Sequence, residues 1–321
     1  MIVRLKRRTL QHSLAAALAF FVFLFLFSSL SIVAPSAFGA NDTNRTVIAR
    51  VNVTNTEPTL YNVKVESTPI DLTAGNATTV ICNGSFSDPN GYTDVTNATA
   101  TLYRTAVASN APDDNSTHYT NSSCMPCEVV DGTGNANGSC LCRFAVQYYA
   151  ENGTWQCNMS ISDSVLLNST RNSSVFRINE VLGINVETTS LDYGTLSASQ
   201  TSAPTRENVI NIGNIPLNVT VRGFGGDDET TGENFTMLCE AGSNITFGNQ
   251  RFSLYNNTAF IDMHNLTNQT RQVPLLTIPK RTENNALGNS SNSTWWRLQI
   301  PLGPAGICNG TIIFGARRSD Y

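Results

Sequence analysis

The chain has few charged side chains and very little histidine. Only 14% of its 321 residues are charged, and three are histidines. His12 lies in an apolar N-terminal segment, whereas His118 and His264 lie in polar stretches rich in Asn, Ser and Thr. The sequence contains no Gly-x-Ser-x-Gly elbow, no His-Glu-x-x-His and no Gly-rich phosphate loop. We therefore expect a protein that is not an enzyme and that binds no organic cofactor.

Basic side chains are also scarce beyond the N-terminus. Residues 1–39 contain four basic and no acidic side chains, so the rest of the chain has 16 Lys plus Arg against 24 Asp plus Glu, a net charge of −8. Nucleic-acid binding requires a basic patch, and an electrostatic attraction to anionic lipid requires clustered Lys and Arg. We therefore expect no nucleic-acid partner, and membrane contact only through the N-terminal segment if that segment is retained.

The chain has one long apolar run and no second one of spanning length. The run, Leu14–Phe27, follows a basic stretch at residues 4–8 and precedes small residues at Ala37–Ala40. This order is typical of a secretory signal peptide, but the stretch to Val33 is also near the ~20 residues that cross a bilayer. Residues 1–39 are thus either a cleaved signal peptide or a retained membrane anchor. In both cases the remainder is exported to the cell surface or beyond.

N-glycosylation acceptors are far more numerous than chance predicts. Of the 36 asparagines, 22 begin an Asn-x-Ser/Thr sequon, whereas random placement would give roughly seven sequons. Four of the acceptor asparagines each follow a residue suited to a core, in the pairs Cys82-Asn83, Cys157-Asn158, Leu217-Asn218 and Cys308-Asn309. Successive side chains of a strand point to opposite faces. We therefore predict that these four asparagines carry sugar on the outside while the preceding residues are buried.

Hydrophobic alternation, rather than a helical period, dominates after residue 40. Short alternating runs, beginning with Val47–Val53, are separated by turns rich in Gly, Asn, Asp and Pro. This pattern predicts an all-β fold with two disulfide-bonded, Ig-like β-sandwich domains after the N-terminal segment. Six cysteines precede residue 183 and two follow it, so we place the domains at residues 44–180 and 184–316.

Four cysteines are closely spaced, as Cys124-Met-Pro-Cys127 and Cys140-Leu-Cys142. Four thiolates at this spacing can hold zinc, and a Cys-x-x-Cys can be redox-active. Export instead favours disulfides, which across a hairpin would pair Cys124 with Cys142 and Cys127 with Cys140. In the second half, the two cysteines, Cys239 and Cys308, are expected to pair with each other.

The first half resembles an immunoglobulin-like domain. Cys82 lies in an early predicted strand and Trp155-Gln156-Cys157 in a late one, although no convincing core tryptophan lies between them. The resemblance implies a Cys82–Cys157 disulfide. Residues 86–91, Phe-Ser-Asp-Pro-Asn-Gly, also resemble the turn that follows the second strand of polycystic-kidney-disease-type domains.

The second half resembles β-sandwich modules of archaeal envelope glycoproteins. The similarity rests on turns and strands at residues 191–196, 211–219, 296–301 and 305–311. It implies architecture and location rather than activity. The resulting hypothesis is an exported, N-glycosylated surface protein with a structural role in the envelope, whose partners are other envelope proteins or glycans. The alternative is an adhesin or receptor-like ectodomain that binds glycan or a partner protein. The longest stretch without a sequon asparagine, residues 173–217, is where we expect a face open to a partner.

Oxygen-bearing side chains cluster at the turn of residues 88–94. Asp88, Asn90 and Asp94, joined by Asp163 after the late strand, could coordinate calcium. The alternative is a type I turn, in which Asp precedes Pro at the second position. Calcium is the metal that this cluster of oxygens would suit.

Two adjacent tryptophans, Trp295 and Trp296, must face opposite ways if they lie in a strand. Trp296, Leu298 and Ile300 form the apolar face, so Trp296 is expected in the core. Trp295 is expected to face outward, as a binding platform or beneath a neighbouring loop or glycan.

Overall fold

The computed structural model describes residues 46–319 except 131, 133 and 284–288. By its internal contacts the chain divides into two compact units, Met1–Val53 and Thr54–Tyr321. The predicted signal or anchor segment, residues 1–39, lies outside the described residues and stays a prediction. Among the described residues, no helix is both long enough and apolar enough to cross a bilayer.

Residues 46–53 are the described part of the first unit. The sequence predicts a strand over Val47–Val53, but this segment pairs with no strand and is exposed throughout. The prediction is therefore wrong for the structure of the single chain. The physical reason is that a strand requires a partner for its backbone hydrogen bonds, and residues 46–53 form no strand pairing with the described residues.

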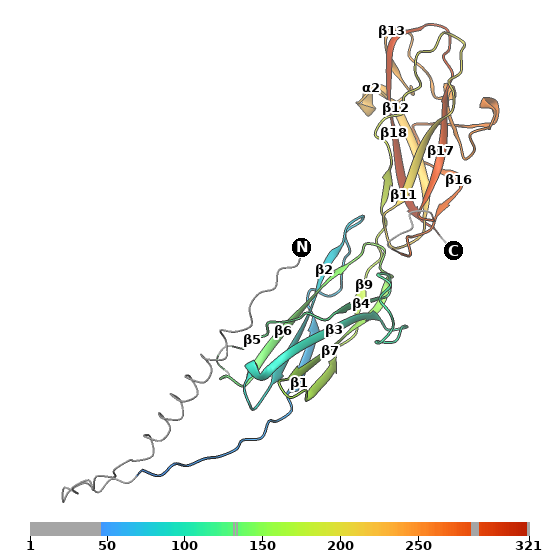
Figure 1. The fold of residues 1–321 in the computed structure, drawn as a ribbon. Coiled ribbons are helices and arrows are strands. Elements are labelled where there is room, and N and C mark those ends of the chain that lie inside the picture. Colours follow the sequence, from blue (N-terminus) through green and yellow to red (C-terminus); the bar gives the residue numbers. More distant parts are fainter. Residues whose placement is uncertain (1–45, 131, 133, 284–288, 320–321) are drawn as a thin grey trace, which may run out of the picture. The chain divides into compact units, whose positions relative to one another are not determined.

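The first half of the second unit contains two antiparallel sheets (Figure 1). One sheet has the order β1 (Thr59–Val65), β2 (Thr78–Ser87), β6 (Asn137–Val146) and β5 (Glu128–Val129). The other has the order β4 (His118–Asn121), β3 (Val95–Arg104), β7 (Gly153–Asp163) and β8 (Asn168–Asn172), and β9 (Phe176–Ile178) pairs with the beginning of β7.

Strand β7 shows why these sequences form a sandwich. Its inward residues Trp155, Cys157, Met159 and Ile161 are all at most 1% exposed, whereas the residues between them are only half-buried. The Trp155 ring contacts Tyr119, with ring centroids 6.1 Å apart. These side chains meet residues of the opposite sheet in one apolar cluster, so the alternation predicted from sequence is confirmed.

The second half has two further sheets, built only from strands after Gly183. The first has the order β10 (Ile184–Val186), β11 (Thr205–Asn211), β17 (Ser291–Leu298), β14 (Gln250–Ser253) and β15 (His264–Asn265). The second has the order β13 (Leu238–Gly242), β18 (Pro304–Arg318), β12 (Leu217–Gly225) and β16 (Arg271–Ile278). A single turn of helix, α2 (Glu229–Gly232), follows β12, and the carboxylate of Asp228 caps it by accepting a hydrogen bond from the backbone N–H of Thr230.

Trp296 is the centre of the second core. It is fully buried, its ring centroid lies 5.1 Å from that of Phe252 on the neighbouring strand β14, and it lies 5.8 Å from that of Phe314 on β18, across the sandwich. The predicted inward face of this strand is therefore confirmed. The indole N–H donates to the hydroxyl of Thr294 at 2.9 Å, which satisfies its one polar group.

The structure contains four disulfides, Cys82–Cys157, Cys124–Cys142, Cys127–Cys140 and Cys239–Cys308, and among the described residues no cysteine is free. Cys82 on β2 and Cys157 on β7 connect the two sheets of the first sandwich through its core. The all-β, disulfide-bonded sandwich fold is confirmed, whereas the domain boundaries at 44–180 and 184–316 stay predictions.

Candidate functional site

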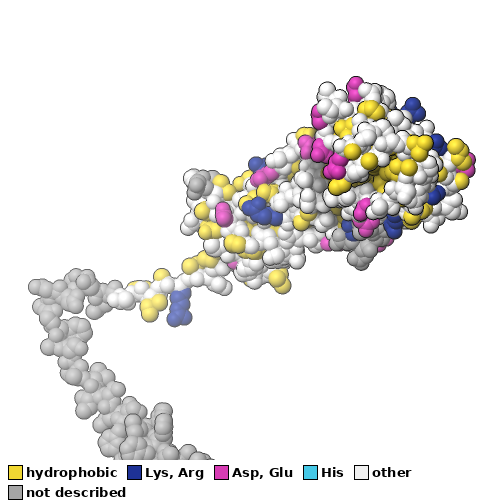
Figure 2. Space-filling model, turned by 90° about the horizontal axis from the view of Figure 1, so that it is seen from above, with side chains coloured by type: hydrophobic (Ala, Val, Ile, Leu, Met, Phe, Trp, Pro, Cys, Tyr) yellow, Lys and Arg dark blue, Asp and Glu magenta, His cyan; other side chains and the backbone are white. Residues whose placement is uncertain are grey.

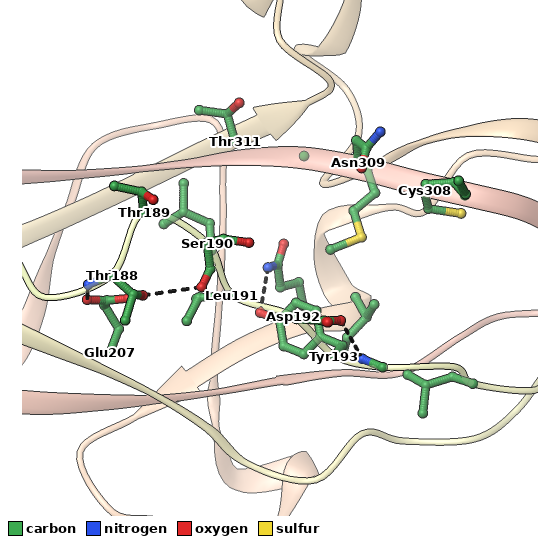
Figure 3. Close-up of a pocket in the computed structure, with 18 of the residues that line it drawn as sticks. Thr188, Thr189, Ser190, Leu191, Asp192, Tyr193, Glu207, Cys308, Asn309 and Thr311 are labelled. Carbon is green, nitrogen blue, oxygen red and sulfur yellow. Dashed lines mark hydrogen bonds between the residues drawn. The ribbon is translucent and has the colours of Figure 1, made fainter.

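A hollow of about 780 Å³ opens in the second sandwich, between its two sheets. Figure 3 shows its two long sides: the irregular segment Thr188–Tyr193 on one, and the strand bearing Cys308, Asn309 and Thr311 on the other. The lining is mixed. Apolar side chains such as Leu191, Ile312 and Phe314 alternate with hydroxyl groups of the 188–190 stretch.

The irregular side of the hollow is held in place by a buried carboxylate. Glu207 on β11 is 2% exposed and accepts hydrogen bonds from both the backbone N–H, at 3.0 Å, and the hydroxyl of Thr188. Further along, the carboxylate of Asp192 accepts from the backbone N–H of Gly194 at 2.8 Å, and Gly194 has a φ of +71°, which glycine adopts without strain. The chain after β10 therefore leaves its sheet and lines the hollow instead of continuing the strand.

Tyr193 forms the floor of the hollow. Its hydroxyl accepts a hydrogen bond from the amide of Gln250 at 2.8 Å, and the amide oxygen of Gln250 in turn accepts from Thr236. Burial raises the pKa of Tyr193 far above its ordinary value, so the phenol is neutral at any physiological pH. The lining of the hollow therefore combines apolar surface, hydroxyls and amides with the carboxylates of Asp192, Glu207 and Asp227.

The turn predicted as a calcium site brings its acidic residues together. Asp88 and Asp163 are fully buried, and Asp88 lies close enough to Asp94 and Asp163 for their charges to interact. Asn90 is directed elsewhere, because its side-chain oxygen accepts from the backbone N–H of Thr56 at 2.7 Å. Within the described part of the chain, no three His, Cys, Asp or Glu side chains are arranged to hold a metal ion. Calcium binding at this turn stays a prediction.

The Asp163 carboxylate is used by the chain itself. It accepts from the backbone N–H groups of Val165 and Leu167, at 3.0 and 2.8 Å, and from the side-chain amide of Asn55 at 3.2 Å. These bonds close the turn between β7 and β8 and attach residue 55 to that end of the first sandwich. A structural role accounts for this buried acid.

The sequon asparagines all have access to solvent. Among the 20 that the structure describes, none is buried. Asn83, Asn158 and Asn218 are half-buried and Asn309 is exposed, while Cys82, Cys157 and Leu217 are buried as predicted. Whether sugar is attached stays a prediction.

Cys308 is a correction, because it is half-buried rather than buried. The reason is that its disulfide joins neighbouring strands of one sheet, where Cys239 and Cys308 lie directly opposite each other with Cα atoms 4.0 Å apart. It does not cross a core, as the Cys82–Cys157 bond does.

The pairing of a buried histidine with an exposed aspartate was not predicted from the sequence. His118 is 1% exposed, and its ring nitrogens lie 2.7 Å from a carboxylate oxygen of Asp113 and 3.0 Å from the carbonyl oxygen of Ser109. Burial alone would raise the pKa of Asp113, but hydrogen bonds from His118 and Thr120 hold it below its ordinary value. Both ring nitrogens are engaged in fixing the loop before β4, so this histidine is structural. In the sequence, the only sign of this contact is that Asp113 and His118 are five residues apart.

No protein-family model matches this chain, and no curated protein matches it in sequence. The similarity to the following three solved structures is weak. The C-terminal domain of the Streptococcus agalactiae AgI/II polypeptide BspA has a TM-score of 0.23 and 10% identity, over 82% of this chain and 96% of that one. A carbohydrate-binding module of the β-sandwich superfamily gives 0.23 and 10%, over 82% and 97%. A DUF4466 family protein from Parabacteroides merdae gives 0.22 and 8%, over 75% and 100%. Scores this low carry no argument about function.

Proposed function

We propose that this chain is an exported, N-glycosylated cell-surface protein with a structural role in the envelope. The observation that carries the proposal is the placement of its sequons: of the 20 described acceptor asparagines, 19 lie in the unit that forms the β-sandwiches, the other is Asn52 in the segment before it, and none is buried. Every acceptor that the structure describes is therefore accessible for modification. The archaeal type of envelope is proposed from the motif resemblance alone.

The covalent structure supports an extracellular location. Four disulfides and no free thiol among the described residues fit an oxidising compartment, because cytosolic proteins keep their thiols reduced. The surface also supports it. Figure 2 shows few charged side chains, scattered among uncharged ones, on the face that it draws. Glycans would supply the solubility that ionic groups supply elsewhere.

Mapping of glycopeptides by mass spectrometry tests the proposal on protein purified from its native cells. We expect sugar on Asn83, Asn158, Asn218 and Asn309. Asn90, which is exposed but heads no sequon, is the matched control and should be unmodified. Recovery of the protein from the cytosolic fraction, with none of these four asparagines glycosylated, would refute the proposal.

The second candidate is an adhesin or receptor-like ectodomain, favoured by the mixed apolar and hydroxyl lining of the hollow. It predicts that Leu191→Asp abolishes binding to a glycan array or to envelope proteins. Val165→Asp, at a residue that is 57% exposed on the first sandwich, is the control that should leave binding intact. Equal binding by both variants would show that the hollow is not the binding site.

A further inference from the structure

The two sandwiches differ in one strand position. In immunoglobulin-type sandwiches, one sheet has the order A-B-E-D and the other contains C-F-G. In the first sandwich, β1-β2-β6-β5 corresponds to A-B-E-D, and β3-β7-β8 to C-F-G, with β9 also beside β7. In the second, β10-β11-β17-β14 corresponds to A-B-E-D, and β12 and β18 to C and F. Position G there contains only the short strand β13.

Half of strand β18 is consequently an open edge. Residues 310–318 pair with β12, whereas β13 reaches only residues 304–309 on the other side. Asn309 accepts a backbone hydrogen bond from Gly226, on the β12 side, at 2.8 Å. Strict antiparallel alternation then directs the backbone groups of Ile312, Phe314 and Ala316 to the opposite side. Strand β10 lies close to β18 but does not pair with it, and no described strand pairs with these groups. We call residues 310–318 the open edge.

The core beneath the open edge is incompletely covered. On β7, the corresponding strand of the first sandwich, every inward side chain from Trp155 to Ile161 is at most 1% exposed. On β18, the inward Ile312, Phe314 and Ala316 contact the core but are only partly buried. The hollow of about 780 Å³ lies along this same edge, between β18 and the segment that follows β10 (Figure 3). It therefore occupies the place that β8 and β9 fill in the first sandwich.

Residues 46–53 have the pattern of the absent strand. Val47, Ala49, Val51 and Val53 alternate with a second face that contains Arg50 and Asn52. The three valines are 74–86% exposed, which is unusual for side chains of this type. Eight residues extend about 27 Å at the strand rise, which matches the nine-residue open edge. Asn52 heads a sequon, so insertion of the valine face would leave its sugar in solvent.

The anchoring of residues 55 and 56 excludes insertion into the same chain's own hollow. The side chain of Asn55 donates a hydrogen bond to Asp163, the last residue of β7. The chain continues into the second sandwich after Ile178, and Ile178 pairs with Gly153, the first residue of β7. These two ends of β7 are ten residues apart, or about 33 Å. Val53 lies within about 7 Å of Asn55, since two residues separate them. The hollow that this segment can fill therefore belongs to a second copy of the chain.

We propose that residues 46–53 of one copy insert as the missing strand along the open edge of a second copy. Main-chain hydrogen bonds to β18 would give affinity, and the valines would cover Ile312 and Phe314. The two surfaces that meet are different, so each copy keeps one free end of each kind and the contact repeats head to tail into a chain of subunits. This inference extends the structural role proposed above, but it rests on strand pairing alone and holds whether or not the protein carries sugar.

Light scattering and negative-stain electron microscopy of the full chain test the proposal. We expect concentration-dependent linear oligomers from the unaltered chain, and at least tenfold weaker association from Val51→Asp. Ile48→Asp adds the same charge on the other face of the same segment and should associate like the unaltered chain. Circular dichroism checks that both variants fold, which we expect because both side chains are at least 79% exposed.

A peptide supplies the second measurement. A synthetic peptide of residues 46–53 should bind the full-length Val51→Asp chain and raise its melting temperature, whereas the same peptide with the Val51→Asp change should do neither. The proposal would be overturned if Val51→Asp and Ile48→Asp associated equally well. It would also be overturned if the unaltered chain were monomeric and the peptide did not bind. Cross-links between isotope-labelled and unlabelled copies must join the segment of one copy to β18 of the other. Links found only within one copy would also overturn it.

Discussion

Asp88 provides the sharpest test of what the buried acidic turn does. Its side chain is fully buried, one carboxylate oxygen accepts from the backbone N–H of Asn90 at 2.8 Å, and the other oxygen has no hydrogen-bond partner. Burial, together with the charges of Asp94 and Asp163, raises the pKa of Asp88 above its ordinary value despite the bond from Asn90. Asp88→Asn keeps the oxygen that closes the turn and removes the charge.

The substitution should stabilise the calcium-free protein at neutral pH. Asparagine keeps a polar group at the position of the unpaired oxygen, but the replacement removes a buried charge and its repulsion from two nearby carboxylates. We expect the free energy of unfolding to rise by about 1 kcal/mol, which for a protein of this size raises the melting temperature by roughly 2–4 °C.

The pH dependence has a definite sign. The pKa of Asp88 is higher in the folded chain than in the unfolded chain, so the folded chain binds the proton more tightly. Protonation of this group therefore stabilises the fold as the pH falls through the folded pKa, and the carboxylate destabilises it above that value. Asp88→Asn lacks this dependence, so its advantage should shrink as the pH is lowered toward 4.

Thermal unfolding in chelator and in millimolar calcium, at pH 4 and pH 7, measures these effects. Asp192→Asn is the control, because Asp192 closes a similar turn with an exposed carboxylate and should change stability little. A loss of stability by Asp88→Asn in chelator would refute the reasoning. Strong stabilisation of the unaltered chain by calcium, lost in Asp88→Asn, would instead establish the calcium site that the sequence suggests.

Two further outcomes follow from the fold, and a third is expected from the sequence. Replacing both Cys82 and Cys157 by alanine opens a bridge that spans 75 residues and should lower the free energy of unfolding by about 4 kcal/mol in the loop-entropy model, measured by denaturant titration. Trp296→Ala should cost about 3–5 kcal/mol by the same titration, because the side chain is fully buried, whereas Trp295→Ala should cost much less. The purified protein should hydrolyse neither peptides nor polysaccharides between mild acid and neutral pH, and release of product in such an assay would contradict the expectation that it is not an enzyme.

Strand periodicity explains how much of the fold could be predicted. An alternating run such as Trp155 to Ile161 fixes which side chains face a core, because one-residue slips would move all of them to solvent. The disulfide pairings could be predicted from three signals: the immunoglobulin-like resemblance for Cys82–Cys157, the hairpin spacing for the two nested bridges, and the presence of only two cysteines in the second half for Cys239–Cys308. Cys308 was predicted wrongly because alternation gives the face of a residue but not whether its bridge crosses a core or joins neighbouring strands.

The hollow could not be predicted from the sequence for a different reason. Its lining joins residues near 190, 250 and 310, and their proximity depends on sheet order, which is a non-local property. Only the absence of sequon asparagines from 173 to 217 indicated that this side would be open. That stretch includes Thr188–Tyr193, which forms one side of the hollow.

The segment Val47–Val53 shows the same division between local and non-local information. Its alternation is the local pattern of a strand, yet residues 46–53 form no strand in the structure. Residues 46–53 have the pattern of a strand but no pairing partner, and the edge at residues 310–318 has no strand on its outer side. The two segments have similar lengths, so one could pair with the other. Selection on the isolated monomer would favour a polar residue at Val51, because an exposed valine there gains nothing from burial and increases the risk of aggregation. Its presence is therefore understood more readily as part of an interface than as part of a linker.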